Sequence, residues 1–159
     1  GKLVSMEKQI FPKIIKNTGH FFGYKFKGHW IDVGRISSYI RVHTILLEKH
    51  KKSFTVGEQC TIQGKLNNSC TGNKVDVGKD TTINSSILFD KVTIGENVLL
   101  EHCVIGENVT IGDGSTLKDV AVGDNEKIER NTKLDNAIIW NQLIPPGYPN
   151  KQIGNVIGE

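Results

Sequence analysis

Few residues of this sequence combine a reactive side chain with a spacing that supports chemistry. His102 is the single histidine between residues 53 and 140. One imidazole can act as a general base, as in acyl transfer, but a zinc site needs several histidines or cysteines together. The sequence therefore argues against a zinc site. Leu100 and Val104, on either side of His102, are expected to face inward, so the side chain of His102 is expected to point outward. We interpret it as a solvated side chain and keep acyl transfer as an alternative.

The cysteines and glycines suggest structural roles. Cys60, Cys70 and Cys103 are odd in number and lack Cys-x-x-Cys spacing, so we expect reduced thiols, two of them inside the fold. Gly-Glu-Asn and Gly-Asp-Gly pieces could be taken for ligand-binding loops. They recur in step with the repeat described next, so we interpret them as corners of that repeat.

Aliphatic residues recur every 17 residues on three interleaved series, and this period determines the predicted fold. Steps of six, five and six residues fit neither a helical stripe nor simple strand alternation. They predict short strands joined by turns, with one aliphatic residue pointing inward on each side of a triangular coil. The sequence thus predicts a mainly β protein, a left-handed parallel β-helix of hexapeptide repeats with about five coils. The series are Val77, Ile94, Ile111 and Ile128; Ile83, Leu100, Leu117 and Leu134; and Leu88, Ile105, Val122 and Ile139.

The same register leads to finer expectations. Glycines that follow the aliphatic residues are expected to use positive φ at the corners. Val56 and Ile62 are expected to form an earlier coil, set back by 21 residues, with extra residues bulging out within 67–74. A second inward position is expected to hold small or β-branched residues: Thr81, Val98, Val109, Ser115, Ala121 and Thr132.

The first 52 residues do not share the repeat. Residues 20–33 alternate aromatic and other residues around Lys27-Gly28, which predicts a β-hairpin. Residues 37–50 predict an amphipathic helix capped by Ser37, and Pro12 is expected to interrupt a short helix over 5–16. The apolar face of the longer helix is expected to comprise Tyr39, Ile40, Ile45, Leu46 and Leu47.

These elements are too few for a core of their own, which leads to a three-part organisation. We expect residues 1–52 to be the C-terminal end of a larger, incomplete α/β domain. Residues 53–140 are expected to form the β-helix. Residues 141–159 are expected to be a tail that caps the last coil or lies at an interface.

Two segments resemble the sugar-nucleotide pyrophosphorylases, most closely their mannose-1-phosphate guanylyltransferase-like members. One is "SMEKQIFP" at residues 5–12, and the other is the Gly-Tyr-x-x-x-Gly-x-Trp-x-Asp-Val-Gly pattern at residues 23–34. The sharpest motif is Trp30-Ile31-Asp32-Val33-Gly34, followed by a Tyr-containing helix and then the repeat. In this family the first segment and the motif strand end the catalytic domain, and a hexapeptide β-helix often follows. The resemblance therefore implies that residues 1–52 are the C-terminal end of an α/β nucleotidyltransferase domain.

The resemblance implies a reaction and a few site residues. Such enzymes join a sugar 1-phosphate to a nucleoside triphosphate and release pyrophosphate, with Mg²⁺ offsetting the phosphate charge. Asp32 matches the aspartate that holds this Mg²⁺ together with a second aspartate upstream, and a carboxylate suits this hard cation. Glu7 and Lys8 are candidates to lie near the sugar phosphate.

The sequence also departs from the family. The Gly-rich nucleotide-binding loop and the upstream metal-binding aspartate do not occur in it. We therefore expect this chain to be a C-terminal fragment, inactive by itself, whose β-helix serves assembly or regulation and supports a homo-oligomer. A non-catalytic assembly or regulatory subunit stays open beside acyl transfer.

Charge and hydropathy limit the classes of partner that this chain is expected to bind. The net charge is only +3, and the lysine run at 48–52 is interpreted as a solvated helix end, so no nucleic-acid partner is expected. No apolar run approaches the length of a membrane span and no signal peptide opens the chain, so we expect no membrane and a cytoplasmic location.

Overall fold

The computed structural model describes residues 3–140 and comprises two compact units, Gly1–Trp30 and Ile31–Glu159. The first unit holds a π-helical turn, η1 (Met6–Ile10), and helix α1 (Phe11–Thr18). The Ser5 hydroxyl accepts the Lys8 amide at 3.1 Å, and the Gln9 side chain accepts the Ser5 amide at 3.1 Å. Pro12 lies in the first turn of α1, where its missing N–H is not needed, so it begins a helix instead of interrupting one.

The expected hairpin at residues 20–33 does not form. Gly19 ends α1 with a φ of 65°, and no strand follows before α2 (Ile36–Lys49). Phe22, Tyr24 and Trp30 are 88%, 91% and 83% exposed, so the described residues do not bury these rings. An isolated two-stranded hairpin is marginal in water, and aromatic alternation alone cannot hold one.

The second unit begins with α2, which starts one residue earlier than predicted. Its N-cap is Arg35, without a side-chain cap, so Ser37 does not cap the helix as expected. Ile40 and Leu47 are buried, in agreement with the predicted apolar face. Leu46 is 46% exposed and does not belong to that face.

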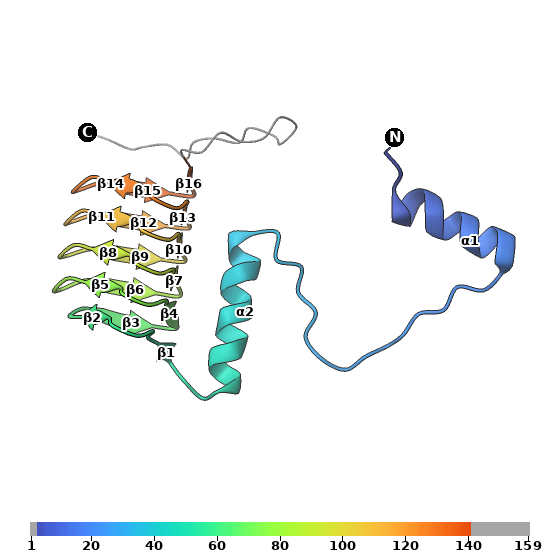
Figure 1. The fold of residues 1–159 in the computed structure, drawn as a ribbon, viewed down its shortest axis with the longest axis horizontal. Coiled ribbons are helices and arrows are strands. Elements are labelled where there is room, and N and C mark those ends of the chain that lie inside the picture. Colours follow the sequence, from blue (N-terminus) through green and yellow to red (C-terminus); the bar gives the residue numbers. More distant parts are fainter. Residues whose placement is uncertain (1–2, 141–159) are drawn as a thin grey trace. The chain divides into compact units, whose positions relative to one another are not determined.

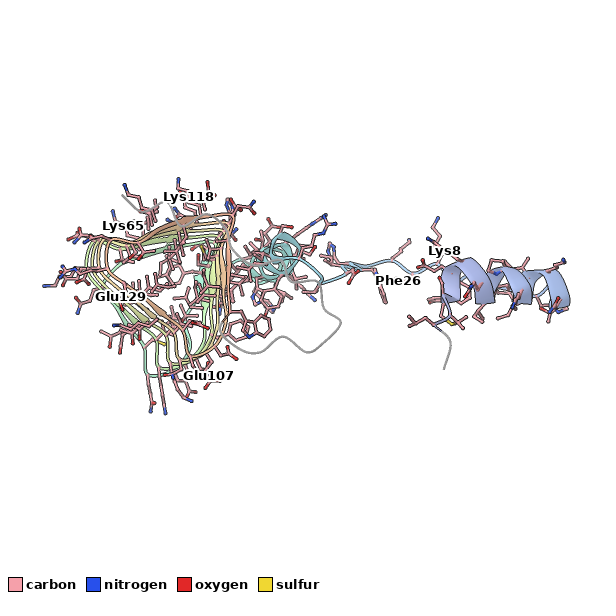
Figure 2. The ribbon with its side chains drawn as sticks, turned by 90° about the horizontal axis from the view of Figure 1, so that it is seen from above. Lys8, Phe26, Lys65, Glu107, Lys118 and Glu129 are labelled. Atoms are coloured by element: carbon pink, nitrogen blue, oxygen red, sulfur yellow. The ribbon has the colours of Figure 1, made fainter. Side chains whose placement is uncertain are left out.

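Sixteen short strands follow, and all their pairings are parallel (Figure 1). Each side of the coil contributes one strand per turn to one of three sheets, and the view along the stack shows a triangle (Figure 2). The first sheet contains β1 (Phe54–Thr55), β4 (Ser69–Thr71), β7 (Ile87–Leu88), β10 (Val104–Ile105), β13 (Ala121–Val122) and β16 (Ile138–Ile139). The second contains β2 (Thr61–Ile62), β5 (Asp76–Val77), β8 (Thr93–Ile94), β11 (Thr110–Ile111) and β14 (Lys127–Ile128). The third contains β3 (Lys65–Asn67), β6 (Thr82–Asn84), β9 (Leu99–Glu101), β12 (Thr116–Lys118) and β15 (Lys133–Asp135).

The predicted register is confirmed from the second coil onward. Leu117 pairs with Leu100 on one side and Leu134 on the other, and it is fully buried. The other two series pair in the same way and supply most of the core. The second inward position holds Val120, fully buried, where the prediction had placed the half-buried Ala121. The fold is therefore a parallel β-helix of about five coils.

The first coil differs from the prediction. Ile62 pairs with Val77, 15 residues away, and Leu66 pairs with Ile83, 17 residues away. The coil is therefore short by two residues at the corner Gln63–Gly64, and no bulge forms at 67–74. Val56 is 40% exposed and does not join the core. The corner can be this tight because Gly64 lies where a Cβ would meet the Thr81 carbonyl oxygen at 2.5 Å.

The residues that adopt positive φ at the corners of the coil are not the glycines expected from the sequence. A residue with positive φ recurs at each corner, mostly an asparagine, an aspartate or a lysine, such as Asn108 at 58° and Asn125 at 62°. The glycines after the aliphatic residues have ordinary φ. They are needed because successive coils approach closely: a Cβ on Gly78 would lie 2.6 Å from the Gly95 carbonyl oxygen. Glycine here provides space and not backbone freedom.

Helix α2 covers the outer face of the first sheet (Figure 2). Neighbouring strand residues point to opposite faces, yet Ile87 and Leu88 are both buried. Leu88 belongs to the interior series, and Ile87 lies beneath α2. The Asn68 side chain also donates to the Thr44 hydroxyl of α2 at 3.0 Å. At 14 residues α2 is the longest described helix, and none of the described helices has the length and hydropathy of a membrane span.

Candidate functional site

The sequence-predicted site residues lie in two different units. Glu7 and Lys8 are exposed neighbours in η1 of the first unit. Asp32 belongs to the second unit, exposed in the segment that leads into α2. A Cβ added to Gly34 would lie 3.9 Å from the Asp32 Oδ1. All three side chains are exposed.

The described residues do not by themselves form a magnesium site. No group of three or more histidine, cysteine, aspartate or glutamate side chains is arranged to hold a metal ion in the described part of the chain. Asp32 offers one carboxylate, which can supply only one or two of the six oxygens that Mg²⁺ requires. Any such site would therefore need ligands beyond those that the described residues bring together.

Two grooves flank α2 where it packs on the β-helix. The first has a volume of about 490 Å³ and an aromatic wall. Tyr39 stacks on Phe89 with ring centroids 6.3 Å apart, and its ring lies 4.9 Å from that of His43. Burial lowers the pKa of His43, which favours a neutral imidazole at this position. The remaining lining includes Cys70 and Asp90.

The second groove is larger, about 1030 Å³. Arg35 and Arg41 contribute to one wall, from the start of α2. The opposite wall is a corner of the β-helix, where one residue per coil turns the chain with positive φ. These corner residues lie one above the other at intervals of 17 in the sequence: Asn68, Ser85, His102, Asp119 and Asn136.

His102 is therefore not simply a solvated residue, although it points outward as predicted. It is exposed, and its Nδ1 lies 3.8 Å from the Asp119 Oδ1 of the next coil. Sequence reasoning missed this wall of the groove. The signal was present, since a 17-residue series of polar residues that favour left-handed backbone accompanies the three aliphatic series.

The cysteines are free thiols, as expected, and they differ in burial. Cys103 is buried, and its Sγ lies 3.3 Å from the carbonyl oxygens of both Glu101 and Leu117, either of which can accept its single S–H. Burial raises the pKa of the Cys103 thiol to about 11, so it is an unreactive core residue at neutral pH. Cys60 and Cys70 are half-buried, and Cys70 faces the first groove.

A comparison with protein families decides where this architecture belongs. The family model described as GMPPB C-terminal domain matches residues 48–152, about two thirds of the chain. The chain belongs to the GMPPB C-terminal domain family. The match covers the whole described β-helix, so the β-helix is the part of the chain that defines the family.

Known relatives agree with this assignment. A glucose-1-phosphate adenylyltransferase of Mycoplasma mobile is 28% identical over 103 residues. The matched stretch covers 46% of the chain and 27% of that protein, so the chain spans little more than a quarter of this relative. Together with the GMPPB match, this confirms the resemblance to the C-terminal portion of sugar-nucleotide pyrophosphorylases.

The similarity to solved structures is low. Serine acetyltransferase isoform 3 of Entamoeba histolytica is 18% identical, with a TM-score of 0.32, over 71% of this chain and 49% of that one. The acetyltransferase domain of PglB from Neisseria gonorrhoeae is 15% identical, with a TM-score of 0.24, over 60% and 63%. Neither likeness bears on the function of this GMPPB-type domain.

Proposed function

We propose that this chain is the C-terminal portion of a sugar-1-phosphate nucleotidyltransferase and is catalytically inactive by itself. The observation that carries the proposal is the family match over residues 48–152, on a chain whose preceding residues hold the Trp-x-Asp-Val-Gly motif. The parent reaction would join a nucleoside triphosphate and a sugar 1-phosphate. A phosphate oxygen of the sugar attacks the α-phosphorus, the bond to the β-phosphate oxygen breaks, and pyrophosphate leaves.

The residues of this chain have limited roles in that reaction. Asp32 would supply one carboxylate to the Mg²⁺ of the parent, and Mg²⁺ would there offset phosphate charge. Glu7 and Lys8 would lie near the sugar phosphate. None of the three can cradle a triphosphate, and the Gly-rich loop of the family does not occur in the sequence. We therefore expect the isolated chain to be inactive, because it lacks the family's loop for the triphosphate.

The β-helix would serve assembly and regulation. It presents apolar side chains outside its core, among them Phe89 at 40% and Ile138 at 48% exposure. Burial of such surface between copies would stabilise a homo-oligomer. The predicted part of the tail in such an interface, residues 141–159, lies outside the described residues. A mass above that of a monomer in light scattering at micromolar concentration would support self-association, and a monomer mass would contradict it.

Acyl transfer is a second candidate with one observation in its favour. His102 Nδ1 lies 3.8 Å from Asp119 in a groove, and a carboxylate neighbour can orient a catalytic imidazole. Both side chains are more than half exposed, however, and no long loop between the described strands reaches over them. An assay of thiol release from acetyl-coenzyme A with amino sugars separates the candidates: release that His102→Gln abolishes would favour acyl transfer.

The finer identity of the parent is part of the proposal. We propose mannose 1-phosphate and a guanine nucleotide as its substrates and the cytoplasm as its location. The test is pyrophosphate release by the full-length parent with GTP and mannose 1-phosphate, compared with ATP and glucose 1-phosphate. Faster release with the first pair would support the mannose assignment, and faster release with the second would overturn it. The 159-residue chain should release none with either pair.

A further inference from the structure

The larger groove beside α2 carries unbalanced positive charge. Arg35 and Arg41 both contribute to its lining, and neither forms an ion pair with any described residue. The only carboxylate in the lining is Asp119, which faces His102. A guanidinium carries its charge at every physiological pH and binds phosphate oxygens in a two-point geometry. Two such groups on one wall of a concave surface favour an anion there.

The rest of the lining suits a ligand that has more than a phosphate group. The corner wall holds polar side chains that can donate and accept hydrogen bonds, among them Ser85 and Asn136. Ile36 and Ile40 add apolar surface on the helix side. The volume of about 1030 Å³ is at the upper limit for small-molecule sites and far exceeds that of one phosphate ion.

We propose that this groove binds a small phosphate ester, with the sugar phosphates of the parent reaction as the ligand class. Arg35 and Arg41 hold the phosphate, and the polar corner of the β-helix contacts the hydroxyl groups. The choice of sugar phosphates rests on the proposed function, whereas the phosphate site itself rests on the groove. Such a site would let substrate or product bind the β-helix unit and regulate the parent enzyme.

A nucleic acid is the less suitable phosphate ligand. A nucleic-acid surface needs an extended basic face. Here the net charge is only +3, and Lys65 and Lys118, which lie outside the groove, belong to the third sheet (Figure 2). Lys118 is also paired with Glu101 at 2.8 Å. A confined groove with two arginines matches one small dianion better.

The test is calorimetric titration of the 159-residue chain with mannose 1-phosphate and glucose 1-phosphate, with free mannose and a short single-stranded RNA as comparison ligands. Sugar phosphates should bind saturably, mannose should not, and the RNA should bind no more tightly than they do. The double variant Arg35→Gln/Arg41→Gln should weaken binding by about tenfold or more, since it removes charged hydrogen-bond donors. Ser37→Trp, at an exposed position of the groove lining, should block binding without a change of charge.

Lys79→Gln/Lys133→Gln is the matched control, since it removes two exposed positive charges away from the groove. An equal loss in both double variants would reduce the effect to general charge and overturn the proposal, as would no binding of either sugar phosphate or tighter binding of RNA. Thermal melts check that each variant folds. Turnover does not enter this measurement, so binding that persists while the full-length parent makes no nucleotide sugar would overturn the proposed function and leave the phosphate site standing.

Discussion

The carboxylate of Asp124 occupies the space that a side chain on Gly106 would need. Its Oδ1 accepts the Glu107 amide from the preceding coil at 2.7 Å, and an ideal Cβ on Gly106 would lie 2.5 Å from the same oxygen. The same arrangement recurs where Asp113 accepts the Glu96 amide at 2.9 Å beside Gly95. The Gly-Glu pairs of the sequence therefore work together with an aspartate one coil later: the glycine leaves room, and the carboxylate satisfies a backbone donor.

Gly106→Ala should destabilise the β-helix by about 1–3 kcal/mol, because the added methyl group is forced against Asp124 and its backbone. Urea unfolding followed by circular dichroism measures the loss. Asp124→Ala removes the nearest contact, so the two changes should not be additive: Gly106→Ala should cost less in the Asp124→Ala background. Additive costs would show that the close approach between the two residues does not matter.

Leu117→Asp should cost several kcal/mol and abolish cooperative melting, since it places an unpaired carboxylate in a fully buried position between Leu100 and Leu134. Thr110→Asp is the matched control, because it introduces the same carboxylate at an exposed strand position. Its melting temperature should stay close to that of the parent chain. Similar losses in the two variants would mean that the assigned inward register is wrong.

The ion pair between Lys118 and Glu101 should contribute to stability in a pH-dependent way. The Lys118 Nζ lies 2.8 Å from the Glu101 Oε2, and its hydrogen bond holds the pKa of Glu101 below the ordinary value of 4.5. A lowered folded-state pKa means that the contribution is present above pH 4.5 and is lost as the pH falls through the lowered pKa. The stability difference between the unchanged chain and Glu101→Gln should therefore shrink with acid below that pH. Lys118→Gln should return the carboxyl pKa, followed by NMR, toward its ordinary value, and a carboxyl pKa unaffected by that change would refute the pairing.

Cys103 should react with iodoacetamide more slowly than the half-buried Cys60 and Cys70 in the folded chain. Its pKa is raised by burial from 9.0 to about 11, so the folded state disfavours the thiolate. Stability should therefore fall as the pH rises from 9 toward 11, because the unfolded chain loses this proton first. Cys103→Ala should remove that part of the alkaline dependence, and Ala137 already fills the equivalent position two coils later. An unchanged alkaline dependence in the variant would contradict the assignment.

The sequence predicted the parts of the fold that repetition determines. Leu100, Leu117 and Leu134 are one aliphatic position repeated, and a fixed period leaves only one way to stack them. The first coil could not be predicted in the same way, because two residues are missing at Gln63–Gly64 and the spacing changes where the series begins. The function of the corner glycines was misread because close approach between coils depends on residues 17 or more positions away.

The candidate site was predicted less well. Asp32 and its motif were visible in the sequence, but the described residues do not form a metal site around them. The grooves beside α2 depend on how the helix docks over Ile87, and no periodicity in the sequence encodes that contact. The corner series of Ser85, His102 and Asp119 carries the same 17-residue period as the core, so it could have been recognised.

The central claim, that this chain completes a sugar-1-phosphate nucleotidyltransferase, is tested most directly at Asp32 in the full-length parent. The measurement is pyrophosphate release from a nucleoside triphosphate with a sugar 1-phosphate and Mg²⁺, for the parent and for its Asp32→Asn variant. Asparagine keeps the size of the side chain and removes the charge that would bind the cation. We predict steady release by the parent and a loss of about a hundredfold or more in the variant, with an unchanged melting temperature. No pyrophosphate release by the parent with any sugar 1-phosphate, or full turnover in the Asp32→Asn variant, would contradict this account.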